Sequence, residues 1–324
     1  MAGRMIGVGL VAMVIAASAC SAGNGTPPSP AATSWTRATM IQPTSASEEI
    51  SVYGISCPTD SLCTAVDENG AAHTWHAGRW SATTPVPAGG SLTAVSCPTA
   101  TECVAVSSSG NSAIYDGRSW SRAPAVGPAA SYRISCPTTD FCAAVGDSGR
   151  PGGPNAVATF DGDSWSTEML SSAEVSDRLF DVSCPTSSFC VAIDLDGSSL
   201  TYDGRRWSLH RAPALQGTTS VSCPVKSFCM AVGPSAYSTF DGKGWSEPKS
   251  IPDNPSAFVP DVSCATPHSC TVVGLNGESV QWRSGAWSIP TSVFTGEFLA
   301  TVAISCPTPQ FCMTVNSRGT AAHT

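Results

Sequence analysis

The chain has 324 residues and a formal net charge of −8, and only 12% of its residues are charged. This is about half of the ~25% that is typical of globular chains, which favours strands and turns over long surface helices rich in Glu, Lys and Arg. The acidic balance excludes a general nucleic-acid binder and a protein held on anionic membranes by basic patches.

The first segment, "MAGRMIGVGLVAMVIAASAC" (1–20), indicates export. Arg4 supplies a positive charge, and the apolar run over 5–17 is too short to span a bilayer. Small residues then precede Cys20, and "AASAC" resembles the lipobox of bacterial lipoproteins, whose cysteine is acylated and becomes the mature N-terminus. We therefore expect a lipoprotein signal peptide over 1–19 and a lipid on Cys20. The alternative is an ordinary signal peptide cut at an A-x-A-like site.

The cysteine count agrees with this interpretation. There are 15 cysteines, and an unpaired one in an exported chain needs a reason. Fourteen of them pair by position, as described below, and Cys20 remains. Residues 20–34 are rich in Pro, Gly and Ser, and predict a flexible tether. The tether would hold a folded domain, residues 35–324, away from a lipid surface.

A repeat organises the rest of the chain. Each of seven copies contains [IV]-S-C, a second cysteine six residues later, and Val or Ile three residues after that. Successive copies begin 39 to 48 residues apart. The copies are "GISCPTDSLCTAV" (54–66), "AVSCPTATECVAV" (94–106), "RISCPTTDFCAAV" (133–145), "DVSCPTSSFCVAI" (181–193), "SVSCPVKSFCMAV" (220–232), "DVSCATPHSCTVV" (261–273) and "AISCPTPQFCMTV" (303–315).

A second motif lies between the copies. It consists of an aromatic residue, a turn rich in Gly, and then Trp-Ser, as in "TYDGRRWS" (201–208). Only six of these tryptophans follow a cysteine pair, and the seventh, Trp35, precedes the first pair. The chain ends in "GTAAHT", which resembles "GAAHT" (70–74) and stops before a Trp. The last repeat therefore lacks its final strand, and the N-terminus has a spare one.

This arrangement predicts a closed ring. Units of about 40 residues, each with four short strands, are typical of a β-propeller, whereas a linear solenoid needs caps at both ends. We expect an all-β, seven-bladed β-propeller with four-stranded blades. Its last blade would combine residues 303–324 with residues 35–42. A β-solenoid is the alternative.

The cysteine pairs allow three interpretations. Structural zinc sites use C-x2–4-C pairs that converge, and redox centres need C-x-x-C or a lowered thiol pKa, whereas here five residues separate the cysteines of each pair. A hairpin turn that begins with Pro places the two cysteines on adjacent strands, within reach of a disulfide. We expect one disulfide per blade: Cys57 with Cys63, Cys97 with Cys103, Cys136 with Cys142, Cys184 with Cys190, Cys223 with Cys229, Cys264 with Cys270, and Cys306 with Cys312.

The other repeated features have structural interpretations. One Trp per blade at a fixed place predicts packing between blades, and the alternative is a platform on which a ligand stacks. The D-G-x-x-W turns resemble the Asp-box of sialidase-type propellers, with a spacing one residue shorter. "DENG" (67–70) and "DLDG" (194–197) are expected to be plain turns, with Ca²⁺ binding as the alternative.

At this level the sequence resembles a known group. The S-C-P-[TS]-x-x-F-C-x-A-V repeat with [YF]-D-G-x-x-W is similar to secreted and lipid-anchored β-propeller proteins of actinobacteria, over residues 35–324. The resemblance implies an extracytoplasmic location, anchored to the cell membrane. It implies no shared catalytic set, and a fold does not fix a function.

Motifs for catalysis are missing from the sequence. The five histidines form no H-E-x-x-H pattern, and the sequence contains no G-x-S-x-G elbow and no Walker loop. We therefore expect no cofactor. Function is expected in the segments that do not repeat: 146–155, 171–181, 251–261 and 294–300, which would share the face opposite the disulfides. The candidate ligand face comprises Asp147, Arg150, Asn155, Asp177, Arg178, Asp253, Phe258, Glu297 and Phe298. The alternative is that these segments are merely tolerated insertions.

These observations favour a monomeric, non-enzymatic binding module that recognises an envelope protein or a glycan and contacts the membrane only through its lipid. One alternative is a hydrolase or lyase with its site at the mouth of a central channel. Another is a structural envelope protein without a discrete ligand.

Overall fold

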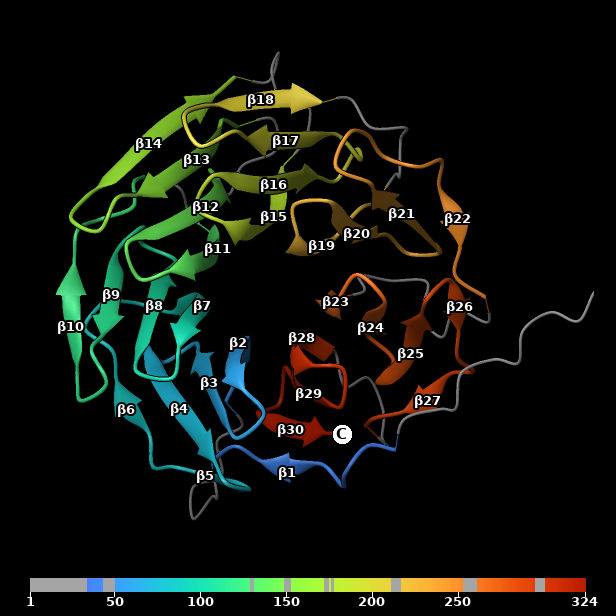
Figure 1. The fold of residues 1–324 in the computed structure, drawn as a ribbon. Helices are drawn as coiled ribbons and strands as arrows, with labels where there is room; N and C mark the ends of the chain where they lie inside the picture. Colours follow the sequence, from blue (N-terminus) through green and yellow to red (C-terminus); the bar gives the residue numbers. More distant parts are fainter. Residues whose placement is uncertain are drawn as a thin grey trace, which may run out of the picture.

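The protein is a ring of seven antiparallel sheets around a central axis (Figure 1). The computed structural model describes residues 34–42, 50–128, 131–148, 153–171, 175, 178–210, 217–252, 261–294 and 301–324. These residues form strands and turns, without a helix, and hence contain none that could cross a membrane. The predicted all-β, seven-bladed propeller with four-stranded blades is confirmed.

Six blades are built from consecutive strands. Blade 1 contains β2 (Val52–Thr59), β3 (Leu62–Asp67), β4 (Ala71–His76) and β5 (Arg79–Trp80), with β6 (Thr84–Pro85) also paired to β4. Blade 2 contains β7 (Leu92–Thr99), β8 (Glu102–Ser107), β9 (Ser112–Tyr115) and β10 (Trp120–Ala123). Blade 3 contains β11 (Ser131–Thr138), β12 (Phe141–Asp147), β13 (Asn155–Phe160) and β14 (Trp165–Leu170).

Blade 4 contains β15 (Leu179–Thr186), β16 (Phe189–Asp194), β17 (Ser199–Tyr202) and β18 (Trp207–His210). Blade 5 contains β19 (Ser220–Val225), β20 (Phe228–Val232), β21 (Ala236–Phe240) and β22 (Lys249–Ser250). Blade 6 contains β23 (Asp261–Thr266), β24 (Ser269–Val273), β25 (Glu278–Arg283) and β26 (Ala286–Trp287), with β27 (Thr291–Ser292) also paired to β25.

Blade 7 joins the two ends of the chain. It contains β28 (Thr301–Thr308), β29 (Phe311–Asn316) and β30 (Thr320–His323), and its outermost strand is β1 (Thr39–Met40). Thr39 pairs with Ala321, and the amide of Ile41 donates to the carbonyl of Gly319 at 2.8 Å. The predicted closure of the ring by the N-terminal strand is therefore confirmed, which excludes the β-solenoid.

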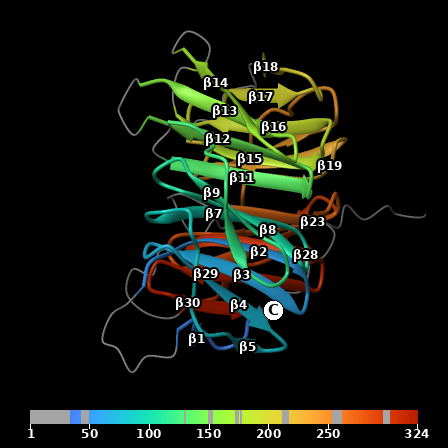
Figure 2. The same ribbon diagram turned by 90° about the vertical axis from the view of Figure 1, so that its left-hand side faces the viewer.

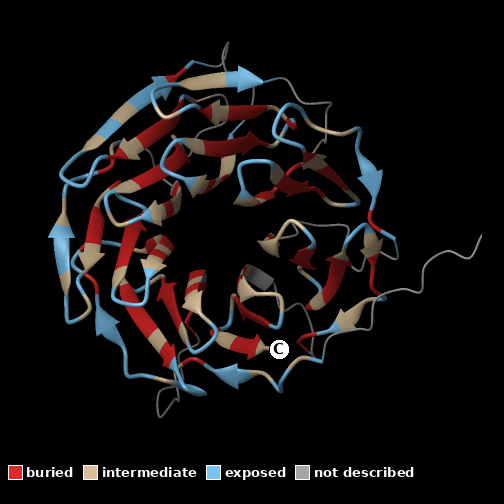
Figure 3. Ribbon diagram, viewed as in Figure 1, coloured by how far each residue is buried: buried red, intermediate tan, exposed pale blue. Residues whose placement is uncertain are grey.

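Burial decreases from the second and third strand of each blade to its outer edge (Figure 3). The second strand is almost wholly buried, as in β3, β16 and β29. The outermost strands are largely exposed, as in β10 and β14. An inner strand packs between two neighbouring blades and therefore needs small or apolar residues on both faces. This requirement explains why the C-x-A-V segment does not alternate between apolar and polar residues.

Seven hydrogen bonds link the innermost strands around the axis. In every blade, the amide of the first cysteine donates to the hydroxyl of the serine that precedes the first cysteine of the blade before it. The distances are 2.9 to 3.0 Å. The ring includes the seam between blade 7 and blade 1, where Cys57 N donates to Ser305 Oγ. The inner edge of an innermost strand has no further strand to pair with, so these serines supply the acceptors that a neighbouring strand would otherwise provide.

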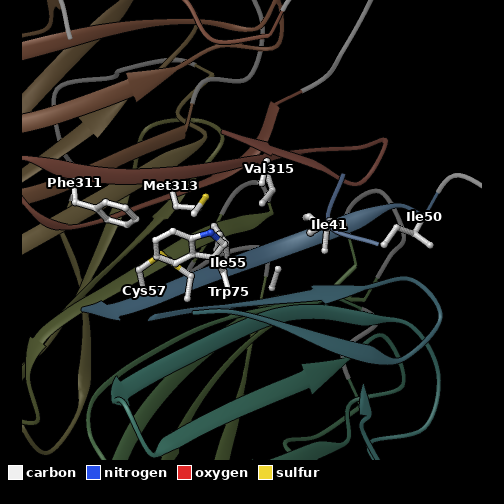
Figure 4. Close-up of a cluster of buried hydrophobic side chains, with 12 residues drawn as sticks. Ile41, Ile50, Ile55, Cys57, Trp75, Phe311, Met313 and Val315 are labelled. Atoms are coloured by element: carbon white, nitrogen blue, oxygen red, sulfur yellow. A yellow bond between two sulfur atoms is a disulfide. The ribbon is translucent and has the colours of Figure 1, made fainter. Parts of the chain in front are cut away.

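The seam between the ends of the chain has a core of its own (Figure 4). Trp75 of blade 1 packs against Phe311 of blade 7, with ring centroids 5.4 Å apart. Ile41, next to β1, is wholly buried in the same cluster. Burial of a side chain of this size stabilises a fold by about 1.5–3 kcal/mol, so hydrophobic packing as well as hydrogen bonding holds the ring closed.

The repeated tryptophans, at the outer edges of the blades, pack between blades, as predicted. Three of them donate their indole N–H to a serine of the preceding blade: Trp165 to Ser112 at 3.3 Å, Trp245 to Ser199 at 3.0 Å, and Trp35 to Ser279 at 2.8 Å. Trp35 thus makes in blade 7 the contact that its counterparts make in blades 3 and 5. This equivalence identifies the N-terminal segment as the missing part of the last repeat.

All seven predicted disulfides are formed. The two Cα atoms of each bridge lie 3.9 to 4.1 Å apart, and every sequence separation is six. The second cysteine of each pair is at most 3% exposed. In six blades a proline follows the first cysteine, where the strand pairing is irregular. A β-bulge tolerates proline because the residue needs no ladder hydrogen bond there.

Candidate functional site: the axial ring and the loop face

The two faces of the propeller differ in their turns. The turns that carry the disulfides join the first two strands of each blade, and the turns before the last strand emerge at the same face, here called the disulfide face. The turns between second and third strands, and the connections between blades, emerge at the opposite face, here called the loop face. Figure 2 shows the ring edge-on, with the strands running from one face to the other. The segments that differ in length between repeats belong to these loop-face connections, because they join second to third strands or one blade to the next.

Three residues of the predicted ligand face are among the described ones. Asp147 ends β12 at the loop face and is part-exposed. Arg178 is exposed just before β15. Asn155 is only 3% exposed, and its Oδ1 accepts a hydrogen bond from the amide of Leu179 at 2.8 Å. Asn155 thus ties blade 3 to the start of blade 4 and does not face solvent. The remaining predicted residues lie outside the described part of the chain: Arg150, Asp177, Asp253, Phe258, Glu297 and Phe298.

Cys20 and the tether over 20–33 also lie outside the described residues. The lipid anchor therefore stays a prediction.

On the innermost strand of each blade, the residue directly before the uniform [IV]-S-C segment differs from blade to blade. It lies near the loop-face end of the strand, and we call the seven residues the axial ring. In blade order they are Gly54, Ala94, Arg133, Asp181, Ser220, Asp261 and Ala303. The ring is polar over four consecutive blades and small and apolar over the other three. This asymmetry distinguishes one side of the axis from the other.

The polar half of the axial ring forms a hydrogen-bonded cluster across blades. Ser220 Oγ lies 3.0 Å from Asp181 Oδ2 and 2.5 Å from Asp261 Oδ1. The amide of Val221 donates to Asp181 Oδ2 at 2.9 Å, and the amide of Ile304 donates to Asp261 Oδ2 at 2.8 Å. Each acidic side chain therefore accepts from the innermost strand of the following blade.

The two carboxyls share an environment that disfavours charge. Burial and, to a lesser extent, the charge of Asp261 raise the pKa of Asp181 to about 7, although the amide of Val221 and the charge of Arg133 act against the rise. Burial also raises the pKa of Asp261, against hydrogen bonds from Ser220 and Ile304 and the charge of Arg133. Both residues keep some solvent-exposed surface. Their carboxyl groups are nevertheless surrounded by enough protein atoms for burial to be the largest cause of the raised pKa values. Two close carboxyls in such surroundings seldom ionise together.

A catalytic role for this pair meets a geometric objection. All four carboxyl oxygens accept a backbone amide: Asp181 Oδ1 from Val182, Asp181 Oδ2 from Val221, Asp261 Oδ1 from Val262 and Asp261 Oδ2 from Ile304. A general acid or base needs an oxygen within reach of the substrate's proton. The cluster as it stands links blades 4, 5, 6 and 7.

The acidic loop-face turns are explained by local hydrogen bonding. Asp67 Oδ1 accepts the amides of Asn69 and Ala71, both at 2.9 Å, and its Oδ2 lies 2.8 Å from His73 Nε2. Asp194 Oδ1 accepts the amide of Ser198 at 2.7 Å. These are the turns for which Ca²⁺ binding is the alternative. Nowhere in the described ranges do three or more His, Cys, Asp or Glu side chains gather in a way that would hold a metal ion.

The D-G-x-x-W turns, on the disulfide face, are likewise held by hydrogen bonds from backbone amides to an aspartate side chain. Asp203 Oδ1 accepts the amides of Arg205 and Arg206 at 2.9 and 3.0 Å. These hydrogen bonds hold the pKa of Asp203 below its usual range. The following Gly204 has φ +91°, and a Cβ there would lie 3.3 Å from that of Ser188. The motif is thus a structural turn, with equivalents at Asp116, Asp161 and Asp241.

A groove of about 490 Å³ lies between blades 5 and 6 on the disulfide face. Phe228 and Trp282 stack in its wall with ring centroids 5.5 Å apart. The same stack occurs between blades 3 and 4, as Phe141 with Tyr202, and between blades 4 and 5, as Phe189 with Phe240. Because the aromatic pair recurs at successive seams, it belongs to the scaffold.

The axial ring is the part of the candidate site that sequence reasoning missed. Its signal is visible once the seven repeats are aligned, because the residue before [IV]-S-C reads G, A, R, D, S, D, A while the next two residues hardly change. The identities alone do not reveal that Asp181 and Asp261 meet around Ser220, since they are 80 residues apart and on alternate blades.

No known family model matches the chain, and no curated protein resembles it significantly. Solved structures do resemble it. YCF48 bound to a D1 peptide aligns with a TM-score of 0.67 at 15% identity, over 92% of this chain and 98% of that one. A streptogramin B lyase aligns with a TM-score of 0.72 at 9% identity, over 89% and 97%. YCF48 from Cyanidioschyzon merolae aligns with a TM-score of 0.65 at 11% identity, over 88% and 98%. Identities this low show a shared fold and carry no activity across.

Proposed function

We propose that the protein is a lipid-anchored binding module of the cell envelope, which recognises a segment of a partner protein at its loop face, around the axial ring. Cys20 would carry the anchor, and the seven disulfides suit an oxidising compartment outside the cytoplasm. The observation that carries this proposal is the asymmetric axial ring. Its residues differ from blade to blade directly beside the [IV]-S-C segment that all blades share, at the end of the strand nearest the loop face.

Exposed residues beside the ring fit a binding role. Tyr53, directly before Gly54, is 36% exposed on an innermost strand, and Arg178 is exposed at the start of blade 4. Tyr and Arg are enriched where proteins bind proteins. A protein of similar fold also binds a peptide, since the structure of YCF48 has been solved with a D1 peptide bound. A glycan is the alternative ligand.

An enzyme is the second candidate, and a specific observation favours it. Asp181 has a pKa raised to about 7, which is typical of acid–base catalysts. A propeller lyase is among the structures of similar fold. We rank this candidate lower because every carboxyl oxygen of the Asp181 and Asp261 pair already accepts a backbone amide.

Site-specific photocrosslinking tests the binding proposal. A photoreactive phenylalanine analogue replaces Tyr53 or Arg178 on the loop face, and Thr101, exposed on the disulfide face, is the matched control. After irradiation in whole cells, we expect the two loop-face positions to capture the same partner and position 101 to capture none. Equal capture at all three positions would contradict a loop-face site.

A parallel measurement tests whether the protein is an enzyme. Purified protein is incubated with a panel of glycans and with streptogramin B, and turnover is measured for the wild type and for Asp181→Asn. Turnover that depends on Asp181, without any crosslinked partner, would replace the binding proposal with the enzymatic one.

A further inference from the structure

The cluster around Ser220 contains more acceptors than its hydroxyl can satisfy. A serine hydroxyl has one hydrogen to donate. Ser220 Oγ nevertheless lies within hydrogen-bond distance of two carboxyl oxygens, Asp181 Oδ2 and Asp261 Oδ1. It also accepts the amide of Val262 at 3.2 Å. If both carboxyls were ionised, one of the two contacts would join a lone pair to a lone pair, which is repulsive.

We propose that one proton is shared across this cluster near neutral pH. Asp181 is protonated and donates through Oδ2 to Ser220, and Ser220 in turn donates to the ionised Asp261. With this proton in place, continuous hydrogen bonds connect blades 4, 5 and 6 through Asp181, Ser220 and Asp261. Loss of the proton at higher pH would break one of these bonds, so the connection between the blades depends on pH. This inference is independent of which ligand the loop face binds.

The two distances fit this direction of donation. Hydrogen bonds from a hydroxyl to an ionised carboxylate are about 2.5–2.7 Å long, shorter than neutral ones. The contact from Ser220 to Asp261 is 2.5 Å and the contact to Asp181 is 3.0 Å. This is the order of lengths expected when Asp261 is the ionised partner and Asp181 the neutral one. A protonated Asp181 Oδ2 can still accept the amide of Val221 through its remaining lone pair.

The charges around the cluster agree with a single proton. The charges that act on Asp181 are those of Asp261 and of Arg133, on the innermost strand of blade 3, and Arg133 also acts on Asp261. Arg133 donates its Nη1 to the carbonyl of Thr93 at 3.0 Å, which fixes its position. One ionised carboxylate balances one guanidinium, whereas two would leave a net negative charge in partly buried surroundings.

The proton couples the stability of the fold to pH. The pKa of Asp181 is about 7 in the folded chain and ~3.9 in an unfolded one. Between these values the folded state binds the extra proton, so this group's contribution to stability falls as pH rises from about 4 to about 7 and is lost above that. The D-G-x-x-W aspartates, with lowered pKa values, act below pH ~4 and in the opposite direction.

A carboxyl titration by NMR tests the proposal on the whole chain with native disulfides. With ¹³C-labelled aspartate, we expect one carboxyl to titrate between pH 5.5 and 8.5 in the wild type and none there in Asp181→Asn. If no carboxyl of the wild type titrates in that range, the proposal is wrong. It is also wrong if the signal survives in Asp181→Asn and disappears in Asp261→Asn, because the proton would then belong to Asp261.

Two charge variants give a test that a merely structural role would not pass. Asp261→Asn removes the neighbouring negative charge and should move the titration midpoint of Asp181 downward. Arg133→Gln removes the positive charge and should move it upward. Asp163→Asn changes an exposed aspartate and is the matched control, with an unchanged midpoint. Shifts of equal sign in the first two variants would overturn the assignment. The wild-type titration decides the proposal even where a variant fails to fold.

Discussion

Each serine of the [IV]-S-C motif has a role that extends beyond its own blade. The hydroxyl of Ser183 accepts the amide of Cys223 at 2.9 Å, and the equivalent bond recurs at every seam. A threonine would bring an additional methyl group into a tight seam, and an alanine would leave the amide without its acceptor. The need for a small acceptor at this place explains why the serine is present in all seven repeats.

Replacing Ser183 with alanine therefore has a predictable cost. A donor deprived of its partner away from water costs about 1–3 kcal/mol, and because the site is only part-buried we expect the lower half of that range. Urea denaturation followed by tryptophan fluorescence measures the change. Ser108→Ala, at an exposed loop-face serine, is the control and should lie within about 0.5 kcal/mol of the wild type. Equal losses in the two variants would show that the axial hydrogen bond is energetically unimportant.

At the scale of the element, the first hairpin of each blade combines two or three devices within a few residues. A proline lies at the bulge in every blade except blade 6, which has Ala265 there, and in all seven blades a disulfide crosses from strand to strand and the following Val or Ile is buried. Most core side chains around these hairpins are Ala, Val and Cys. A core of small residues buries little apolar area per residue, so covalent bridges are a substantial part of the stability.

Removal of one bridge tests this view. In the chain-entropy model, a closed loop of about seven residues corresponds to roughly 2.4 kcal/mol. We expect the double variant Cys184→Ala with Cys190→Ala to lose about that much stability in urea denaturation. The single variant Cys20→Ser, which leaves all seven bridges intact, is the control. An unchanged midpoint would mean that packing alone determines the stability of blade 4.

At the scale of the whole molecule, closure depends on a short N-terminal segment. Deleting residues 34–42 removes Trp35, its hydrogen bond to Ser279, and the buried Ile41. Ile41 alone stabilises the ring by about 1.5–3 kcal/mol, so we expect a clearly lower melting temperature. Deleting nine residues of the tether, 22–30, is the length-matched control. A melting temperature that is the same for both deletions would refute N-terminal closure as a source of stability.

The anchor is tested by changing one atom. Replacing the sulfur of Cys20 with oxygen, in Cys20→Ser, removes the thiol that a lipid would modify. We expect the variant to move from the membrane fraction to the soluble fraction, as judged by detergent partitioning, with an unaltered melting temperature. Unchanged partitioning would leave the ordinary signal peptide as the better interpretation.

The repeat made much of this architecture predictable. Blade number, strand order, disulfides and ring closure follow from residues that recur at a fixed period, because each copy must solve the same packing problem. The site is harder to predict for the opposite reason. Asn155 looks like a solvent-facing loop residue in the sequence, but it bonds to Leu179 inside the seam. The contact among Asp181, Ser220 and Asp261 depends on the distance between successive blades, and the repeat pattern in the sequence does not predict that distance.

The pairing of β1 with β30 also constrains the order in which the chain can fold. Thr36 bonds to His323, 287 positions away. If the protein is exported N-terminus first, as we propose, residues 34–42 leave the membrane at the start, long before their partner strand exists. Six blades can assemble while export continues, but the segment nearest the proposed anchor must wait for the last one. Until that strand emerges, the open seam presents Trp75 and Ile55 to the surroundings, so this is the period when the protein is most vulnerable to proteases and to mispairing with a neighbouring chain.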